Sequence, residues 1–107
     1  MRMLLKVTLD TTTANNTVRN GTLGSTIKSI LDDLKPEAAY FAEDGGERTG
    51  YIFFDLKEPS QIPAVAEPWF LAFNAKVNLR PAMNPGDLAQ AAPGIEAAVK
   101  KHGKAGH

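Results

Sequence analysis

Apolar and polar side chains alternate along four separate segments of the chain, which span residues 3–9, 37–43, 49–56 and 74–81. An alternation with a period of two residues is typical of half-buried β-strands. Between the second and third segments, residues 43–47 read Glu-Asp-Gly-Gly-Glu, a composition that favours a tight turn. The pattern therefore predicts four strands, the middle two of which form a β-hairpin.

A helix is predicted from about Asn15 to Leu34, because apolar residues recur there at helical spacing. The recurring positions are Leu23, Ile27, Ile30, Leu31 and Leu34. The first half of this segment is rich in asparagine and glycine, which have poor helix propensity. Either the helix begins near Thr22, or its first turns pack so closely that only glycine fits. The Lys35-Pro36 pair ends the helix.

A second helical region opens at Pro59 and carries the aromatic residues Trp69, Phe70 and Phe73. Pro68 is predicted to interrupt or kink it, because proline has no backbone N–H to donate. A short C-terminal helix is expected over residues 84–101, with a break or restart at Pro93-Gly94, followed by a flexible tail over residues 102–107.

The resulting order, βαββαβ plus a terminal helix, predicts an α+β protein with a ferredoxin-like fold. We expect a single domain over residues 1–107, with its core in residues 3–83. The sheet has four antiparallel strands with both main helices on one face, and the first strand lies between the third and the fourth. The C-terminal helix is an addition to this fold.

The two faces of the predicted sheet differ in composition. One face is almost wholly apolar and should lie under the helices: Leu5, Val7, Leu9, Phe41, Ile52, Phe54, Leu56, Val77 and Leu79. The other mixes aromatic and charged groups: Lys6, Thr8, Tyr40, Tyr51, Phe53, Asp55, Asn78 and Arg80. Aromatic residues and arginine are enriched at protein interfaces. We therefore expect a second copy to cover this face, since two-fold homodimers are the commonest oligomers.

Composition narrows the classes of function. The 107 residues carry 12 Lys or Arg and 12 Asp or Glu, a balance that gives no electrostatic reason to expect a nucleic acid or membrane partner. The chain has no cysteine, which excludes disulfides, thiolate metal sites and cysteine nucleophiles and is typical of a cytoplasmic protein. No apolar run reaches the roughly 18 residues of a membrane span, and the N-terminal apolar stretch is too short for a signal peptide.

Over residues 3–83 the chain resembles the dimeric α/β barrel superfamily, in which ferredoxin-like domains pack sheet to sheet. The resemblance depends on the element order, the aromatic helix with Trp69, and a last strand running into residues 81–85. It is similar to small uncharacterised bacterial proteins of this type. The superfamily includes cofactor-independent monooxygenases, muconolactone-type isomerases and haem-degrading enzymes, so the fold implies little about chemistry.

The resemblance implies a ligand pocket between sheet and helices, often with a histidine or an acid on those elements. The only histidines here are His102 and His107, in the C-terminal tail. A haem-ligating histidine on the second helix, or a His–Asp pair across the pocket, therefore has no counterpart in this chain. We expect no cofactor and no metal, because no metal-ligand spacing is present.

The mixed sheet face supplies the weak catalytic candidates Asp55, Asn78 and Arg80, with Lys6, Tyr40 and Tyr51 as ligand-binding candidates. Two cations and an amide could hold a carboxylate or an enolate, while Asp55 or a tyrosine moves the proton. The alternative is an ion-pair network inside the dimer, where unpaired charges would be costly.

Three further features have a chemical and an ordinary interpretation. Trp69 could stack on a flat ligand, or it could anchor the core beside Phe73. Residues 20–26 could bind phosphate at a helix start, but a lone Gly-x-x-Gly favours helix capping or close packing. The acidic residues at 32–33 and 43–47 are typical of solvated helix ends and turns.

Three functions follow from these features. The first is a homodimeric small-molecule-binding or regulatory domain that needs no catalysis. The second is a cofactor-independent isomerase or monooxygenase acting on a small aromatic or polyketide-like compound, since substrate positioning can supply much of such chemistry. The third is a purely structural interaction domain, which predicts no cavity between sheet and helices.

Overall fold

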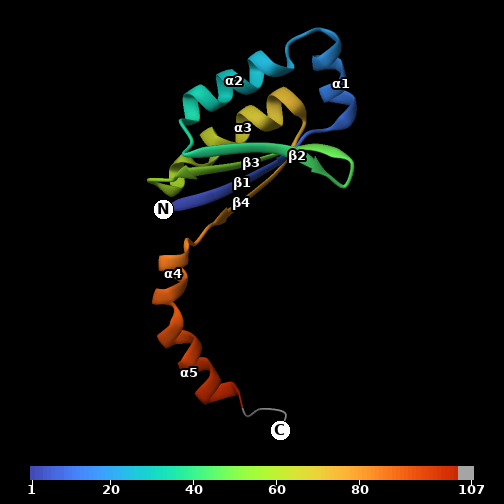
Figure 1. Cartoon of the computed structure of the whole chain (residues 1–107). Helices are drawn as coiled ribbons and strands as arrows, with labels where there is room; N and C mark the ends of the chain where they lie inside the picture. Colours follow the sequence, from blue (N-terminus) through green and yellow to red (C-terminus); the bar gives the residue numbers. More distant parts are fainter. Residues whose placement is uncertain (104–107) are drawn as a thin grey trace.

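The computed structural model describes residues 1–103 and has an α+β architecture that is compatible with a ferredoxin-like fold (Figure 1). The elements are β1 (Arg2–Thr8), α1 (Thr11–Arg19), α2 (Leu23–Leu34), β2 (Ala38–Asp44), β3 (Glu47–Asp55), the 3₁₀ turn η1 (Pro59–Gln61), α3 (Ile62–Phe73), β4 (Lys76–Pro81), α4 (Pro85–Gln90) and α5 (Ala92–His102). The four strands lie within two residues of their predicted bounds.

The sheet is antiparallel throughout, in the order β2-β3-β1-β4, so β1 lies between β3 and β4 as predicted. The β2–β3 hairpin turns at Gly45 and Gly46, whose φ angles of +61° and +82° match the two central positions of a type I′ turn. Both positions favour glycine, because a Cβ atom is strained at such angles.

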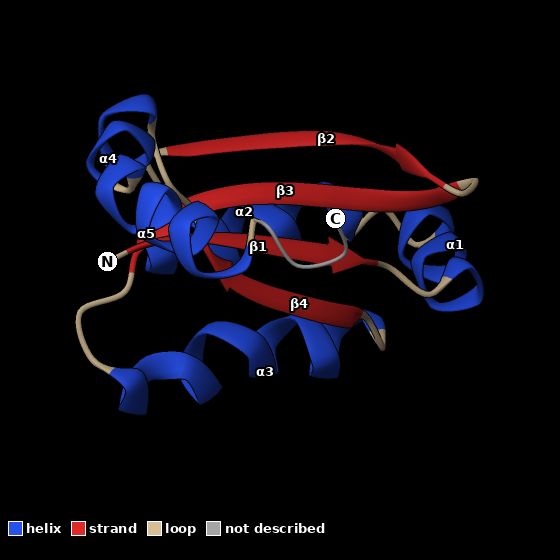
Figure 2. Ribbon diagram, turned by 90° about the horizontal axis from the view of Figure 1, so that it is seen from below, coloured by secondary structure: helices blue, strands red, loops and turns tan. Residues whose placement is uncertain are grey.

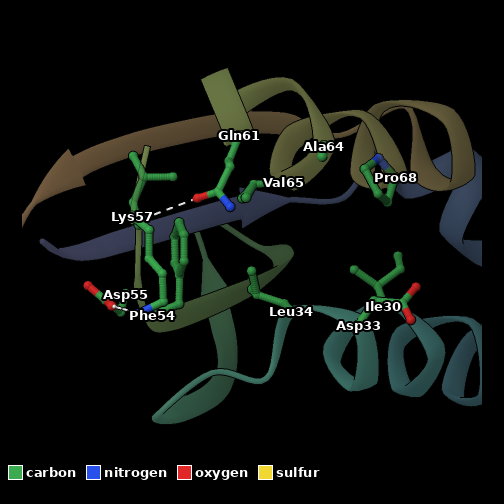
Figure 3. A pocket seen from close by; sticks show the side chains of 11 residues that line it. Ile30, Asp33, Leu34, Phe54, Asp55, Lys57, Gln61, Ala64, Val65 and Pro68 are labelled. Atoms are coloured by element: carbon green, nitrogen blue, oxygen red, sulfur yellow. Dashed lines mark hydrogen bonds and ion pairs between the residues drawn. The ribbon is translucent and has the colours of Figure 1, made fainter. Parts of the chain in front are cut away.

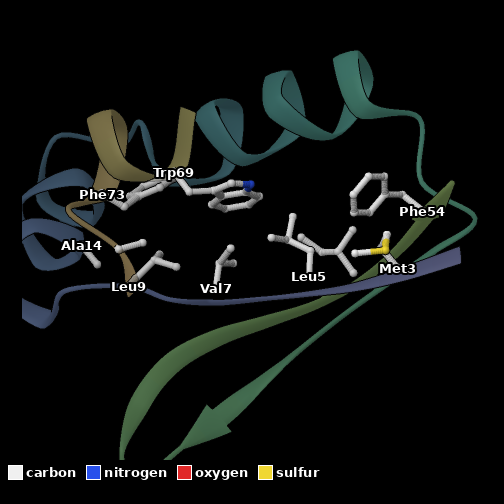
Figure 4. Packing of buried hydrophobic residues seen from close by; sticks show 10 residues of the cluster. Met3, Leu5, Val7, Leu9, Ala14, Phe54, Trp69 and Phe73 are labelled. Carbon is white, nitrogen blue, oxygen red and sulfur yellow. The ribbon is translucent and has the colours of Figure 1, made fainter. Parts of the chain in front are cut away.

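Helices α1, α2 and α3 cover one face of the sheet, and Figure 1 shows them as a layer above it. The buried core lies between, with Trp69 and Phe73 of α3 above Leu5, Val7 and Leu9 of β1 (Figure 4). Each such large side chain contributes roughly 1.5–3 kcal/mol when fully buried. The helix layer is incomplete, however, and Phe41 of β2, predicted to lie under the helices, is 51% exposed.

The opposite face of the sheet is uncovered, as the view from below shows (Figure 2). Its residues follow the strand register: Tyr40, Tyr51, Lys6 and Asn78 form one continuous row across the four strands. We call this surface the open face. The assignment of these residues to one face is confirmed by the register.

One continuous helix from Asn15 to Leu34 is wrong, because two helices occupy this segment, but the alternative start near Thr22 is confirmed: α2 begins at Leu23 with Thr22 as its N-cap. α1 begins four residues earlier than expected, since the Asp10 carboxylate caps it by accepting from the Thr13 backbone N–H at 3.0 Å. It ends at Asn20-Gly21, where Gly21 has a φ of +76°. α2 then starts at Leu23, so the weak helix propensity at residues 20–22 marks a break between helices and not a tightly packed turn.

The predicted interruption at Pro68 is wrong, because α3 runs without a break from Ile62 to Phe73 with Pro68 inside it. Pro68 cannot donate to the carbonyl of Ala64, which therefore lacks its helical donor. The helix persists because Trp69 and Phe73, just beyond the proline, are fully buried. Packing of an apolar face supplies most helix stability in proteins and outweighs one missing hydrogen bond.

The C-terminal segment forms two helices that project away from the sheet on the side of the open face (Figures 1 and 2). We call α4 and α5 together the arm. The predicted restart lies at Ala91-Ala92, one residue before Pro93, because proline is favoured in the first turn of a helix. His102, expected in the tail, belongs to α5; the rest of the predicted tail, residues 104–107 with His107, lies outside the described residues.

A cross-strand contact between Phe41 and Gly50 gives a test of the sheet. A Cβ atom at position 50 would lie 2.9 Å from Phe41 Cε1 and 3.0 Å from Val7 Cγ2. We expect Gly50→Ala to lower the free energy of unfolding by about 1–3 kcal/mol, because overpacking forces these side chains apart. Urea denaturation measures the change. Gly94→Ala, where a Cβ meets nothing within 4 Å, is the control; equal stability of both variants would contradict the contact.

Candidate functional site

The structure offers two places for chemistry, the open face and a hollow between helices and sheet. On the open face, Lys6 forms an ion pair with Asp44 at the end of β2. The Tyr51 hydroxyl donates to the same carboxylate at 3.3 Å, and Lys6 Nζ lies 5.9 Å from the centre of the Tyr51 ring. Lys6, Asp44 and Tyr51 therefore form one connected polar group.

The two charges in this group shift each other's pKa. The hydrogen bond from Lys6, then its positive charge and the Tyr51 hydroxyl, lower the pKa of Asp44. The hydrogen bond to Asp44 and its negative charge raise the pKa of Lys6 against the opposing effect of desolvation. Both groups are therefore held in their charged forms around neutral pH, which suits an ion pair and not a proton-transfer pair.

The other candidates on the open face, Asn78, Arg80 and Asp55, lie at different distances along the strands from this polar group. Asn78 pairs directly with Lys6 in the register, and Arg80 lies one row further along beside Leu4. Asp55 is at the far end of β3, where its carboxylate lies 2.8 Å from Lys57 Nζ and 2.7 Å from the Met1 amino group. Lys57 first, and then the Met1 amino group, lower the pKa of Asp55 to about 2. So weak a base is poorly suited to abstracting a proton.

Trp69 is fully buried, and its ring centre lies 6.0 Å from that of Phe73. Its indole Nε1 is a buried donor with no hydrogen-bond partner among the described residues. Within residues 1–103, Trp69 lines none of four surface hollows between and beside the helices. The structure therefore places it in the core, outside these four hollows.

The hollow lies between α2, the N-terminal half of α3 and the end of β3 (Figure 3), and we call it the α2–α3 hollow. Its volume is about 480 Å³. Apolar groups form the walls and charged groups stand at the rim. The lining includes Ile30, Leu34, Phe54, Val65 and Pro68, with Asp33 and Lys57 among the charged residues.

The polar groups at the rim are largely engaged with one another. Lys57 Nζ lies 2.8 Å from Asp55, and Gln61 Oε1 accepts from the backbone N–H groups of Lys57 and Glu58 at 3.2 and 3.1 Å (Figure 3). Ala64 and Pro68 of α3 also line the hollow. The hollow can hold an apolar body and offers few free reactive groups.

Other candidate residues have structural roles. Asn20 Oδ1 accepts from the Thr22 backbone N–H at 3.1 Å in the turn between α1 and α2, which accounts for part of the 20–26 segment. Asp32 pairs with Lys28 at 2.7 Å, one helical turn away. Within residues 1–103, His, Asp and Glu side chains form no cluster of three that could hold a metal ion. No helix in that range has the length and apolar character needed to cross a bilayer.

The resemblance implies a pocket between sheet and helices, but sequence reasoning identified neither the α2–α3 lining of the hollow nor the role of Asp44. Three separate elements form the hollow, and no local pattern shows how they meet. The position of Asp44, by contrast, can be predicted from strand alternation. It lies four residues after Tyr40 in the same strand, so both side chains are on the open face. From the sequence alone, Asp44 falls among the acidic residues 43–47 that are expected in a solvated turn.

Comparison with known proteins does not narrow the choice of family or function. The sequence matches no family profile, and a search of curated proteins finds no significant match. The structure itself defines the class, a small α+β protein with a four-stranded antiparallel sheet covered by helices on one face.

The Lys6–Asp44 pair predicts a pH dependence of stability. Because the pKa of Asp44 is lowered on folding, its contribution is present above the unfolded value of about 3.9 and is lost as the pH falls through the folded value. We expect wild type to be more stable than Asp44→Asn near neutral pH and the difference to shrink below about pH 4. Thermal unfolding from acid to neutral pH measures this. Asp33→Asn, which removes an exposed acid outside the pair, is the control; an unchanged difference at acid pH would contradict the assignment.

Proposed function

We propose that this chain is a small-molecule-binding domain that works as a homodimer, with its ligand in the α2–α3 hollow. The observation that carries the proposal is the hollow itself, about 480 Å³ in volume, with apolar walls and polar groups at the rim. Small-molecule sites typically have roughly 300–1,000 Å³ and this distribution of polarity. The hollow also lies between sheet and helices, where the resemblance to dimeric α/β barrels implies a pocket.

The lining favours a small, mainly apolar molecule with one polar end. Leu34, Val65 and Phe54 supply apolar contact for its body. Lys57, whose ammonium group has three donors, can supply a donor for its polar end. Binding of this kind needs no catalytic group. In the lining, Lys57 is paired with Asp55, and the pKa of Asp55 is about 2, which makes Asp55 a weak proton acceptor.

The homodimer is supported by the composition of the open face. Tyr40 is 67% exposed there, and its row partner Tyr51 is only half-buried. Phe53 and Leu4 lie side by side in the next row. A solvent-facing sheet surface has no need of four large apolar or aromatic side chains, whereas the core of an interface is enriched in them. Packing two open faces together gives the arrangement of a dimeric α/β barrel.

Native mass spectrometry of gently purified protein tests the assembly and the cargo together. We expect the mass of two chains, because the open faces bury each other in the proposed dimer. Where the ligand stays bound through purification, we expect a reproducible additional mass equal to that of the ligand. Tyr40→Glu should shift the population to single chains, since it sets a charge in the interface; Glu58→Ala, away from the open face, should not. A monomer at all concentrations would overturn the dimer.

Filling the hollow tests the site. Ala64 is exposed on α3 and lines the hollow, so Ala64→Trp should occupy the space without disturbing the core. We expect wild type to bind anilinonaphthalene sulfonate, an aromatic body with an anionic end, and Ala64→Trp to bind it at least about tenfold more weakly. Fluorescence titration measures both. Glu67→Trp, exposed on the same helix and not part of the lining, should bind as wild type does; equal loss in both variants would contradict the site.

A further inference from the structure

The arm lies apart from the rest of the chain. The molecule has a radius of gyration of 18.2 Å and extents of 60 × 31 × 22 Å, whereas a compact chain of this length has a radius of gyration of about 13 Å. Every residue of α4 and α5 is exposed. An isolated helix of about 11 residues is marginally stable in water, so the exposed arm lacks the packing that normally maintains a helix.

The arm nevertheless has an apolar side. Within α5, Ala92, Ile95 and Val99 follow one another at intervals of three and four residues, the spacing of one helix face, and Leu88 of α4 adds a further apolar side chain. Leu88, Ile95 and Val99 are 54%, 56% and 60% exposed. Lys100 and Lys101 form the basic end of α5. A helix with this pattern is typically one that packs against another surface.

A groove on the helix-covered side of the sheet is also unfilled. It lies at the hairpin end of the molecule, between α2 and β2, and we call it the α2–β2 groove. Leu9, Leu23, Ile27, Phe41, Glu43 and Arg48 line it, and its volume is about 340 Å³. No helix lies behind β2 in Figure 2, which explains why Phe41 is half exposed.

The arm and the groove lie at opposite ends of the sheet. The arm leaves the end where β4 finishes, and the hairpin is at the other end (Figures 1 and 2). A chain cannot place its arm in its own groove without reversing direction after β4. A second copy, packed on the open face and related by a two-fold axis perpendicular to the strands, brings its hairpin end beside the arm.

The lengths agree with this arrangement. Packed sheets lie about 10 Å apart, and a helix layer lies roughly another 10 Å beyond. The arm, residues 85–102, spans about 27 Å at 1.5 Å per residue. It can therefore pass the end of the partner sheet and reach the groove on its far side.

We infer that α5 docks in the α2–β2 groove of a second copy, so that two arms are exchanged across the dimer. The apolar side of α5 covers Phe41 and Ile27, while Lys100 and Lys101 approach Glu43 and Glu47 of the hairpin. Neither glutamate forms an ion pair within residues 1–103. This inference depends on the dimer of the proposed function, but not on its ligand.

Disulfide trapping tests the exchange directly, because the chain has no cysteine of its own. Val99→Cys is placed in one chain and Glu43→Cys in another chain of different tagged length, and the two are mixed and oxidised. We expect a covalent product containing one chain of each length, since a disulfide forms only when the Cα atoms come within about 7 Å. The control replaces Glu43→Cys by Leu71→Cys, an 81% exposed site on α3 that should not be trapped.

The outcomes separate the arm from the dimer. A two-chain mass with no Glu43–Val99 product, or with trapping at Leu71 instead, overturns arm exchange while the dimer stands. A monomer overturns both. A chain carrying both cysteines that closes only within itself also overturns the exchange, because the arm then folds back on its own groove.

A second pair of variants measures the contact without cysteines. Ile95→Asp combined with Val99→Asp should raise the dimer dissociation constant about a hundredfold, because two apolar side chains lose their burial. Ala97→Asp, on the opposite side of α5, should leave it within about twofold. Binding of anilinonaphthalene sulfonate in the α2–α3 hollow should be unchanged in both variants. An equal dissociation constant in the two variants would overturn the docking of this side of α5.

Discussion

The contact of α3 with the inward side of β1 determines where the rest of the molecule can lie. β1 is flanked by β3 and β4, so its side chains Leu5 and Val7 lie near the middle of the sheet, and Trp69 and Phe73 cover them. The indole N–H of Trp69 has no hydrogen-bond partner within residues 1–103, at a cost of roughly 1–3 kcal/mol. Burial of so large a ring offsets that cost. This ring fills the centre of the helix–sheet layer, and the α2–α3 hollow and the α2–β2 groove lie toward the two ends of that layer.

Coverage of the sheet is one-sided and incomplete, and both facts bear on function. The open face exposes a row of aromatic and charged residues, while β2 has no helix behind it. An antiparallel sheet can leave one face in water, but it then usually alternates apolar and polar residues cleanly. Tyr40, Tyr51 and Phe53 depart from that pattern. The surfaces that this chain leaves bare are those that the proposed dimer would cover.

The sequence predicted the sheet well, because side-chain alternation is a property of each strand alone. It assigned Lys6, Tyr40, Tyr51 and Asn78 to one face, and the register confirms that they form one row. Predictions from backbone propensity were less reliable. Pro68 does not end α3, since the buried aromatic residues after it hold the helix in place, and the expected first helix is divided at Gly21. The α2–α3 hollow and the projecting arm depend on the relative placement of elements, which no local pattern contains.

The start of the arm is more closely defined than its exposure suggests. The Asn84 side chain accepts from the Asp87 backbone N–H at 2.8 Å, the Asp87 carboxylate accepts from the Asn84 backbone N–H at 3.0 Å, and Arg2 lies 3.9 Å from the same carboxylate. These contacts fix the direction in which α4 leaves the sheet. The direction of the arm decides which assembly an arm-to-groove contact can form. Two chains related by a two-fold axis can each bind the other's arm, which gives a closed dimer. If the arm points elsewhere, it binds a third chain, whose arm binds a fourth, and the assembly stays open. In the dimer that we propose, the Asn84–Asp87 capping box and its contact with Arg2 would therefore favour a closed pair over an open filament.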